Sequence, residues 1–172
     1  LITGMQPSSQ TSQQSVPRVA MPPEEAEVPS DVRLQALCAR EHQACFACRP
    51  VGQGGLGLGL VFTVQADGAV VADWAPPPGV ESFAGIVHGG LLATALDSAM
   101  VHALFARGIV ARTGELTVRY RQSVRLGAQV RVVGRHRQAA HPLHYLEAEV
   151  WQDGALCARA QAKFMATQPL PR

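Results

Sequence analysis

The sequence predicts an α+β domain in which a long antiparallel sheet wraps around one long, apolar helix. Residues 87–108 form the one long segment that is apolar on most sides. Two segments with strand-like composition precede it, and four with near-alternating apolar and polar residues follow it. A helix of this kind must be enclosed by other elements. The chain has 172 residues, of which 47% are hydrophobic, and this suffices for one sizeable core.

The N-terminal part divides into a tail and a short helix. Residues 1–30 are rich in Gln, Ser and Pro and contain no aromatic residue, which predicts a disordered tail followed by one folded domain over 31–168. Ser30 or Asp31 can cap a helix that runs to about residue 42. We expect this helix to present Val32, Leu34, Leu37 and Cys38 on one side.

The remaining elements follow from turn residues and periodicity. Gly108 is placed to end the long helix as a C-cap. Residues 76–85 are expected to form a loop. The strands after the helix are joined by short turns, so we expect a four-stranded antiparallel meander. The predicted strands are 57–65 and 68–76 before the helix, then 113–123, 128–138, 143–152 and 155–167.

Composition excludes several classes of function. A net charge of +2 is too small to indicate nucleic-acid binding. The longest apolar run, at 91–106, is interrupted by Asp97 and His102 and is too short to span a membrane. The first residues lack the cationic start and apolar run of a secretory signal. Four cysteines are few for this length, and together these features predict reduced thiols in the cytoplasm.

The start of the long helix, His88-Gly89-Gly90, is suited to binding negative charge. The first turn of a helix leaves backbone N–H groups unpaired, and glycine lets a ligand approach them closely. A carbonyl oxygen that develops negative charge would be stabilised there. The alternative is that the two glycines only allow close packing against a strand. His88 is expected to cap or orient the helix start, and a direct part in the chemistry, as a catalytic residue of the site, is the alternative.

Asp97 needs a partner or a purpose, because an unpaired buried carboxylate is costly. Two helical turns, about 11 Å, separate it from the Gly-Gly start. The acid of one subunit could therefore serve the Gly-Gly end of another across a symmetric interface. The alternative is a satisfied polar group bonded to Thr94, Ser98 or the backbone. His102 is expected to be a core or interface residue.

These residues resemble the hotdog-fold acyl-CoA thioesterases of the phenylacetic-acid-degradation (PaaI-like) type. The resemblance rests on GIVHGGLLATALDSAM (85–100), CFACRPVGQGGLGLGLVF (45–62) and LTVRYRQSVRLGAQVRV (116–132), and extends over about 44–166. It implies hydrolysis of a coenzyme A thioester without metal or cofactor, in a homodimer or homotetramer with the site at the subunit interface.

The resemblance also implies residue roles. Gly89 and Gly90 would polarise the thioester carbonyl, and Asp97 of the neighbouring subunit would be nucleophile or general base. Thr113 falls where a hydroxyl residue often assists the attacking water. Relatives often carry Asn or Gln before the His-Gly-Gly, for which Ser82 is the nearest counterpart, and Asp-Glu where this chain has Asp97-Ser98.

Two rival functions and two further residue groups stay open. A non-catalytic acyl-CoA binding module could use the same cleft, and a hotdog dehydratase or hydratase would need a second catalytic His that we do not find. Arg119 and Arg121 share a strand face and could bind the phosphates of coenzyme A, or could belong to a solvated sheet face. A last group has zinc-like composition but lies on one short segment, so free thiols are favoured and no metal is predicted: Cys38, His42, Cys45 and Cys48.

Overall fold

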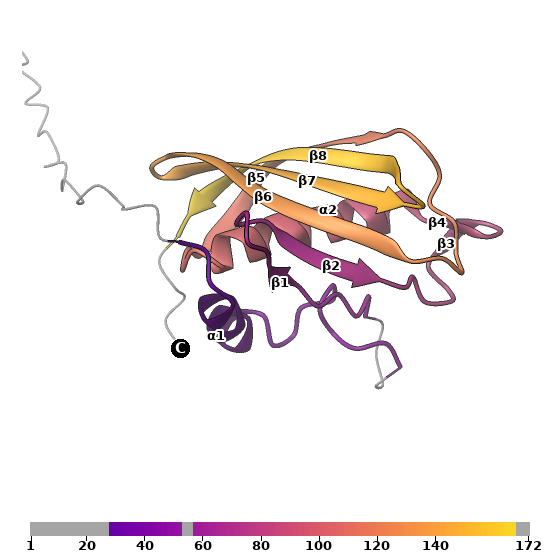
Figure 1. The fold of residues 1–172 in the computed structure, drawn as a ribbon, viewed down its shortest axis with the longest axis horizontal. Coiled ribbons are helices and arrows are strands. Elements are labelled where there is room, and N and C mark those ends of the chain that lie inside the picture. Colours follow the sequence, from indigo (N-terminus) through magenta and orange to yellow (C-terminus); the bar gives the residue numbers. More distant parts are fainter. Residues whose placement is uncertain (1–27, 53–56, 168–172) are drawn as a thin grey trace, which may run out of the picture.

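Six strands form one antiparallel sheet in the order β1-β2-β6-β7-β8-β5, so that β1 and β5 are its edges (Figure 1). The computed structural model describes residues 28–52 and 57–167. A separate hairpin, β3–β4, and two helices complete the described part. The bounds are α1 Asp31–Glu41, β1 Thr63–Val64, β2 Val70–Trp74, β3 Glu81–Phe83, β4 Ile86–Val87, α2 Gly89–Phe105, β5 Ala111–Tyr120, β6 Val130–Ala140, β7 Leu143–Gln152 and β8 Ala155–Ala166.

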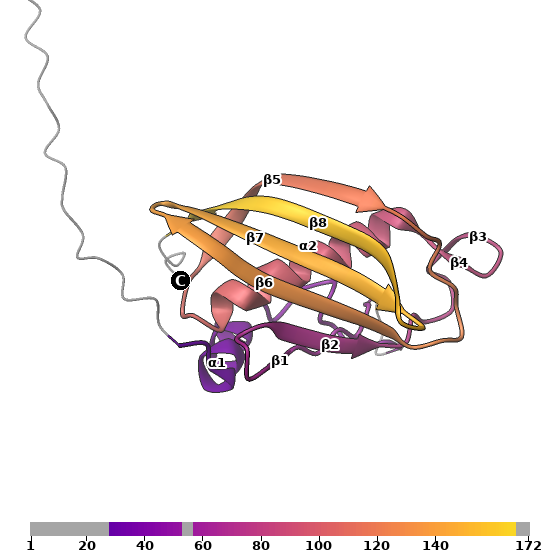
Figure 2. The same ribbon diagram turned by 45° about the horizontal axis from the view of Figure 1, so that its top comes forward.

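The long helix α2 packs lengthwise against one face of the sheet, which confirms the predicted α+β architecture (Figure 2). It contacts β2, β5, β6, β7 and β8. Its closest approach is to β6, where a side chain at Gly134 would overlap the carbonyl group of Ala99. Glycine at this position therefore lets the helix backbone lie directly on the strand.

The predicted four-stranded meander is wrong in one respect. Only β6, β7 and β8 are neighbours joined by hairpins. β5 pairs with β8 instead of β6, so β5 is an edge strand of the sheet. The segment 121–129 carries the chain from β5 across to β6, which pairs with β2. Alternation identifies strands but carries no information on which strand each one pairs with.

The segment before the helix also differs from its predicted form. The strand expected over 57–65 is reduced to the two residues of β1, although Leu58 and Leu60 are buried. Their N–H groups donate to the carbonyls of Phe46 and Ala47, so this stretch pairs with the preceding loop rather than with the sheet. The loop expected over 76–85 contains β3 and leads directly into β4.

Helix α1 begins as predicted, but one residue is misplaced. Ser30 is the N-cap residue without a capping bond from its side chain, and the Asp31 carboxylate accepts from the Val64 N–H at 2.7 Å. Leu34 is buried, whereas Val32 is 79% exposed and does not share its face. Residues two positions apart point to nearly opposite sides of a helix, which explains the error.

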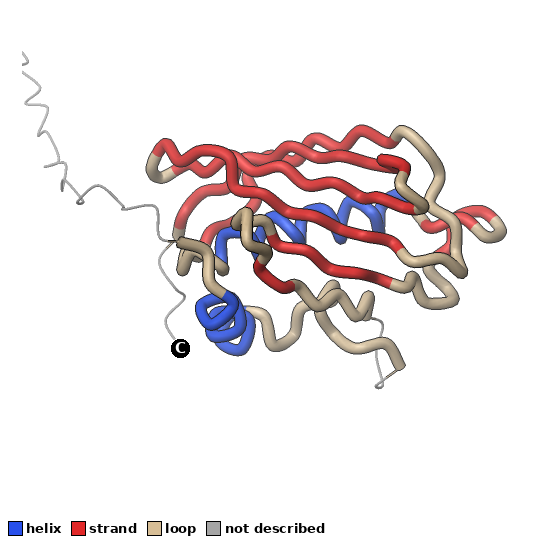
Figure 3. Tube along the Cα trace, viewed as in Figure 1, coloured by secondary structure: helices blue, strands red, loops and turns tan. Residues whose placement is uncertain are grey.

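Helix α2 is shorter than the predicted 87–108 because its regular turns end at Phe105. Gly108 lies just beyond in the left-handed region, with φ 77°, and the Ile109 N–H returns to the Leu104 carbonyl. This pattern of bonds confirms the expected glycine C-cap. His102 is a core residue with 2% exposure. Figure 3 shows α2 as the blue helix covered by the red strands.

The expected tail, 1–30, falls outside the described residues except for 28–30. Within those three, the Ser30 N–H donates to the Ala106 carbonyl and fixes the start of α1 beside the end of α2. The described residues contain no helix that is long and apolar enough to cross a membrane.

Candidate active site

His88 caps the N-terminus of α2. Its backbone is extended, with φ −62° and ψ 128°, and its Nδ1 accepts the Gly90 N–H at 2.9 Å. A side chain at Gly90 would come within 3.0 Å of that ring nitrogen, so glycine lets the imidazole fold back over the first turn. The capping role expected for His88 is confirmed. Because the Gly90 N–H donates to the His88 ring, it is not free to bind a ligand.

Gly89 is left as the available donor of this turn. Among the described residues, its N–H has no hydrogen-bond acceptor, as is usual for the first residue of a helix. On the other side of the same residue, the Gly89 carbonyl accepts the Tyr120 hydroxyl at 2.8 Å. The last residue of β5 therefore fixes the position of the helix start.

The Asp97 carboxylate is held by a hydroxyl group from β5. Thr113 Oγ1 donates to Asp97 Oδ1 at 2.7 Å. The resemblance implies that Thr113 assists the attacking water; the structure places its hydroxyl beside the acid of the same chain. A β-bulge between Thr113 and Glu115 lies next to this contact, and bulges of this kind re-aim side chains locally.

Burial raises the pKa of Asp97 above its ordinary value, and the Thr113 hydrogen bond partly opposes this rise. Charge on the neighbouring Cys45 raises the pKa further, and charge on His42 lowers it. A half-buried carboxylate with a raised pKa and one bound hydroxyl suits proton transfer better than an exposed acid does.

Asp97 and Gly89 do not meet within one chain. They are eight residues apart in one helix, which corresponds to about 12 Å along its axis. Asp97 belongs to a half-buried stripe of α2 that the sheet leaves uncovered, since β5 ends the sheet beside it. The half-buried members of this open stripe are Ala93, Thr94, Asp97 and Val101, and the exposed Gly90 lies at its start.

Ser82 lies in β3, in the hairpin that immediately precedes α2. Its side chain is exposed. The hairpin is held near the helix start by a bond from the His88 N–H to the Val80 carbonyl and by one from the Val87 N–H to the Val124 carbonyl. The hairpin carries Ser82 toward the same end of the molecule as Gly89 without a hydrogen bond between them.

The arginines lie away from the acid. The side chains of Thr113, Leu116, Val118 and Tyr120 alternate toward α2, so Arg119 points to the outer face of the sheet. It lines a hollow of about 270 Å³ there, and Arg121 follows just after the end of β5. The structure of one chain does not bring either arginine to Asp97.

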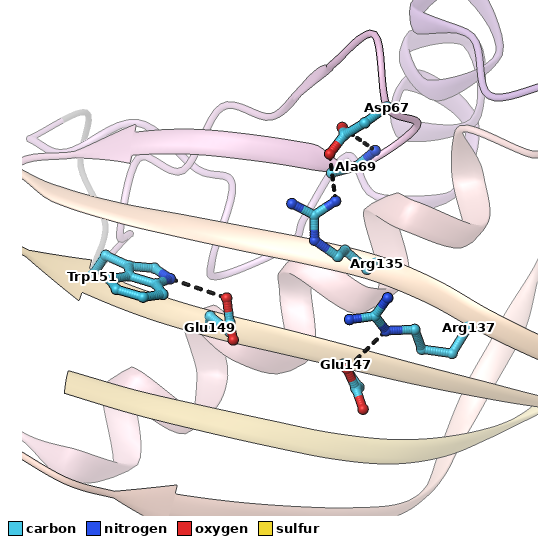
Figure 4. A network of polar contacts seen from close by, with 7 residues as sticks. All are labelled: Asp67, Ala69, Arg135, Arg137, Glu147, Glu149 and Trp151. Carbon is cyan, nitrogen blue, oxygen red and sulfur yellow. Dashed lines mark hydrogen bonds and ion pairs between the residues drawn. The ribbon is translucent and has the colours of Figure 1, made fainter. Parts of the chain in front are cut away.

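Most other arginines on this outer face are paired with acids, as Figure 4 shows for part of it. Arg135 binds Asp67 at 2.6 Å and Arg137 binds Glu147 at 2.7 Å. Arg131 on β6 is paired with Asp73 in the same way, and outside the sheet Arg125 is paired with Asp153. Within the described residues, Arg119 and Arg121 have no such ion pair.

Sequence reasoning missed a contact between the cysteine-rich loop and α2. Ligand atoms of His42, Cys45 and Cys48 lie within 4.8 Å of one another, and Cys48 Sγ is 3.5 Å from His102 Nε2. The cysteine spacing was visible, but no signal in the sequence links this loop to a histidine 54 residues further on.

Comparison with known proteins agrees with this architecture. The family model "Thioesterase superfamily" matches residues 84–158. No curated protein sequence matches the chain. Among solved structures, the thioesterase superfamily protein RHA08564 has a TM-score of 0.62 and 22% identity. That match covers 64% of this chain and spans only 57% of the other protein.

Two further solved structures match more of their own length. The protein smu.793 of Streptococcus mutans, bound to acetyl CoA, has a TM-score of 0.59 and 19% identity, with 63% of this chain and 88% of that chain covered. The Escherichia coli PaaI protein of the phenylacetic acid degradation operon has a TM-score of 0.60 and 17% identity, with 64% and 81% covered. The chain therefore has the hotdog fold of these structures, and over residues 84–158 its sequence is similar to the thioesterase superfamily.

Proposed function

We propose that the protein hydrolyses acyl-CoA thioesters, with Asp97 as the nucleophile or general base. The observation that carries the proposal is the Asp97 carboxylate, half-buried and bonded to Thr113, on a helix whose first N–H, that of Gly89, has no acceptor among the residues that the structure describes. In the proposed reaction the thioester carbonyl points at this N–H, which stabilises the developing oxyanion. As general base, Asp97 takes a proton from the water that attacks the carbonyl, the C–S bond breaks, and the proton passes to the leaving thiolate. As nucleophile, Asp97 forms an acyl anhydride that water then cleaves; both routes give the free acid and coenzyme A.

The proposed site needs two subunits. Because about 12 Å of helix separates Gly89 from Asp97 in one chain, one subunit would supply the helix start and its partner the carboxylate. The open stripe of α2 and the long free edge of β5 support this, since an unpaired edge of ten residues is a ready surface for pairing. We therefore propose a homodimer, or a tetramer of such dimers.

Arg119 and Arg121 remain the proposed contacts for the phosphates of coenzyme A. Within the described residues both guanidinium groups lack an acidic partner, unlike Arg135 and Arg137 on the same sheet. Arginine suits phosphate because its donors match two oxygens at once. In a dimer or tetramer, an arginine on the outer face of one subunit can reach a ligand bound to another.

The solved relative bound to acetyl CoA supports this ligand class. We also propose that the protein works in the cytoplasm, since none of its four cysteines forms a disulfide. The proposal involves neither nucleic acid nor a membrane as partner.

The test is release of free coenzyme A thiol from a panel of phenylacetyl, benzoyl and straight-chain acyl-CoA esters. Wild type is compared with Asp97→Asn, which keeps the shape and an acceptor for Thr113. Asp153→Asn is the matched control, because it neutralises an exposed acid that is paired with Arg125 and lies in the turn between β7 and β8, outside α2. We expect turnover that falls at least 10²-fold in Asp97→Asn and is unchanged in Asp153→Asn.

The outcomes separate the rival functions. Ligand affinity measured by calorimetry should survive in Asp97→Asn if the residue acts on the reaction rather than on binding. Binding of acyl-CoA with no turnover of any ester by folded wild type would establish a non-catalytic binding module instead. Equal turnover in the two variants would remove Asp97 from the mechanism.

A further inference from the structure

The loop after α1 places three ligand-type side chains on one side. Its backbone continues in helical turns: the His42 N–H donates to the Cys38 carbonyl, the Cys45 N–H to His42, and the Arg49 N–H to Cys45. Residues three apart in such turns share a face. His42, Cys45 and Cys48 are spaced by three, and their ligand atoms accordingly lie within 4.8 Å of one another.

A fourth ligand-type atom comes from the core helix. His102 of α2 points its Nε2 at Cys48 Sγ, 3.5 Å away, and its ring packs beside Phe62 and the ring of His42. Its other nitrogen, Nδ1, lies 2.7 Å from the Ser98 carbonyl. A carbonyl can only accept, so Nδ1 carries the proton and Nε2 presents a lone pair to the cluster.

This tautomer is the one that metal-binding histidines use. A ligating imidazole characteristically donates its second N–H to a carbonyl or carboxylate, which fixes the ring and directs the free nitrogen at the metal. Two thiolates and two imidazoles form a common ligand set for zinc. From this geometry we propose that His42, Cys45, Cys48 and His102 bind one Zn²⁺ ion.

The two distances from Cys48 are close to those expected around a single tetrahedral ion. With Zn–S of about 2.3 Å and Zn–N of about 2.0 Å, a sulfur and a nitrogen on one tetrahedral zinc are about 3.5 Å apart. Cys48 Sγ is 3.5 Å from His102 Nε2 and 4.0 Å from His42 Nδ1. A small inward movement of the loop brings His42 to the same separation.

The sequence disfavoured a zinc site because its candidate ligands lie on one short segment, and α2 supplies a ligand from elsewhere in the chain. Structural zinc sites join ligands from separate parts of a chain, whereas the sequence alone offers only one short segment. His102 supplies the remote ligand, 54 residues from Cys48. The ion would therefore fasten the loop at 42–49 to the core helix that also carries Asp97, which is a structural rather than a catalytic role.

The test measures metal content rather than activity, so it fails or succeeds independently of the thioesterase proposal. The full chain, with any affinity tag removed, is purified from zinc-supplemented medium without chelators and analysed by mass spectrometry of metals. We expect about one zinc per chain in wild type. Cys45→Ser and Cys48→Ser should lose it. Cys38→Ser, a half-buried thiol one turn away, and Cys157→Ser in β8 should keep it.

A second measurement covers the case in which the serine variants do not fold. Chelator-treated wild type is titrated with Co²⁺, and the thiolate charge-transfer and tetrahedral d–d absorption bands are recorded. We expect both bands to saturate at one equivalent and to vanish when Zn²⁺ is added. Metal-free wild type that gives neither band would overturn the proposal and leave a plain hydrogen bond from the Cys48 thiol to His102. Metal retention in both Cys45→Ser and Cys48→Ser would overturn it equally.

Discussion

The contact between Gly134 and α2 gives a prediction whose size can be worked from the structure. In Gly134→Ala the new Cβ would stand 2.6 Å from the Ala99 carbonyl carbon, whereas ordinary carbon–carbon contact begins near about 3.5 Å. The helix must therefore move by about 1 Å, or β6 must bend. An extra methyl group in a packed interface costs about 1–3 kcal/mol.

This cost is measurable by thermal unfolding. For a chain of this length, each kcal/mol lowers Tm by about 2–4 °C, so Gly134→Ala should lower it by roughly 2–12 °C. Gly114→Ala in β5 is the matched control. Its Cβ would meet only the Lys163 carbonyl oxygen at an ordinary 3.5 Å, so its Tm should stay within about 2 °C of wild type.

The same substitution should affect turnover if the proposed mechanism is correct. Ala99 lies two residues beyond Asp97, so a displaced helix moves the carboxylate relative to Thr113 on β5. A misplacement of about 1 Å can cost on the order of 10²-fold in rate. Equal Tm values for the Gly134 and Gly114 variants would refute the argument that glycine is needed for the helix to lie on β6.

Three further predictions concern the two ends of the site. Burial raises the pKa of Asp97, so the folded state favours the protonated carboxyl and wild type loses stability as pH rises through that raised pKa. Asp97→Asn has no such loss. In urea titrations it should become progressively more stable than wild type above about pH 4. A gap that is constant with pH would contradict this. Thr113→Val removes the bond that holds the pKa of Asp97 down, so the acidic limb of kcat/KM should move to higher pH, and an unmoved limb would separate Thr113 from the reacting acid. His88→Ala removes the N-cap of α2 and should lower the free energy of unfolding by about 1 kcal/mol in chemical denaturation. His141→Ala, in an exposed turn, is the control. Equal losses in the two variants would show that the His88 cap does not stabilise the helix.

The site could be predicted from the sequence in part. The spacing from His88 to Asp97 and the glycines between them are local features, and a local feature keeps its meaning whatever surrounds it. The capping role of His88 was expected on this basis, and the structure agrees. Thr113 was named only through the family resemblance, and its contact with Asp97 is visible only in the structure. The side of the sheet taken by Arg119 was not predictable, because the bulge next to Thr113 sets the alternation of the residues that follow.

The sequence by itself determined the kinds and order of the main elements, since periodicity and turn residues act over a few positions. It determined that the apolar segment starting at Gly89 had to be enclosed. Only the tertiary structure decided that β5 pairs with β8, that residues 58–60 pair with a loop, and that His102 meets Cys48. These contacts join residues far apart in the chain, and they form because burying α2 against the whole sheet outweighs what any single segment prefers.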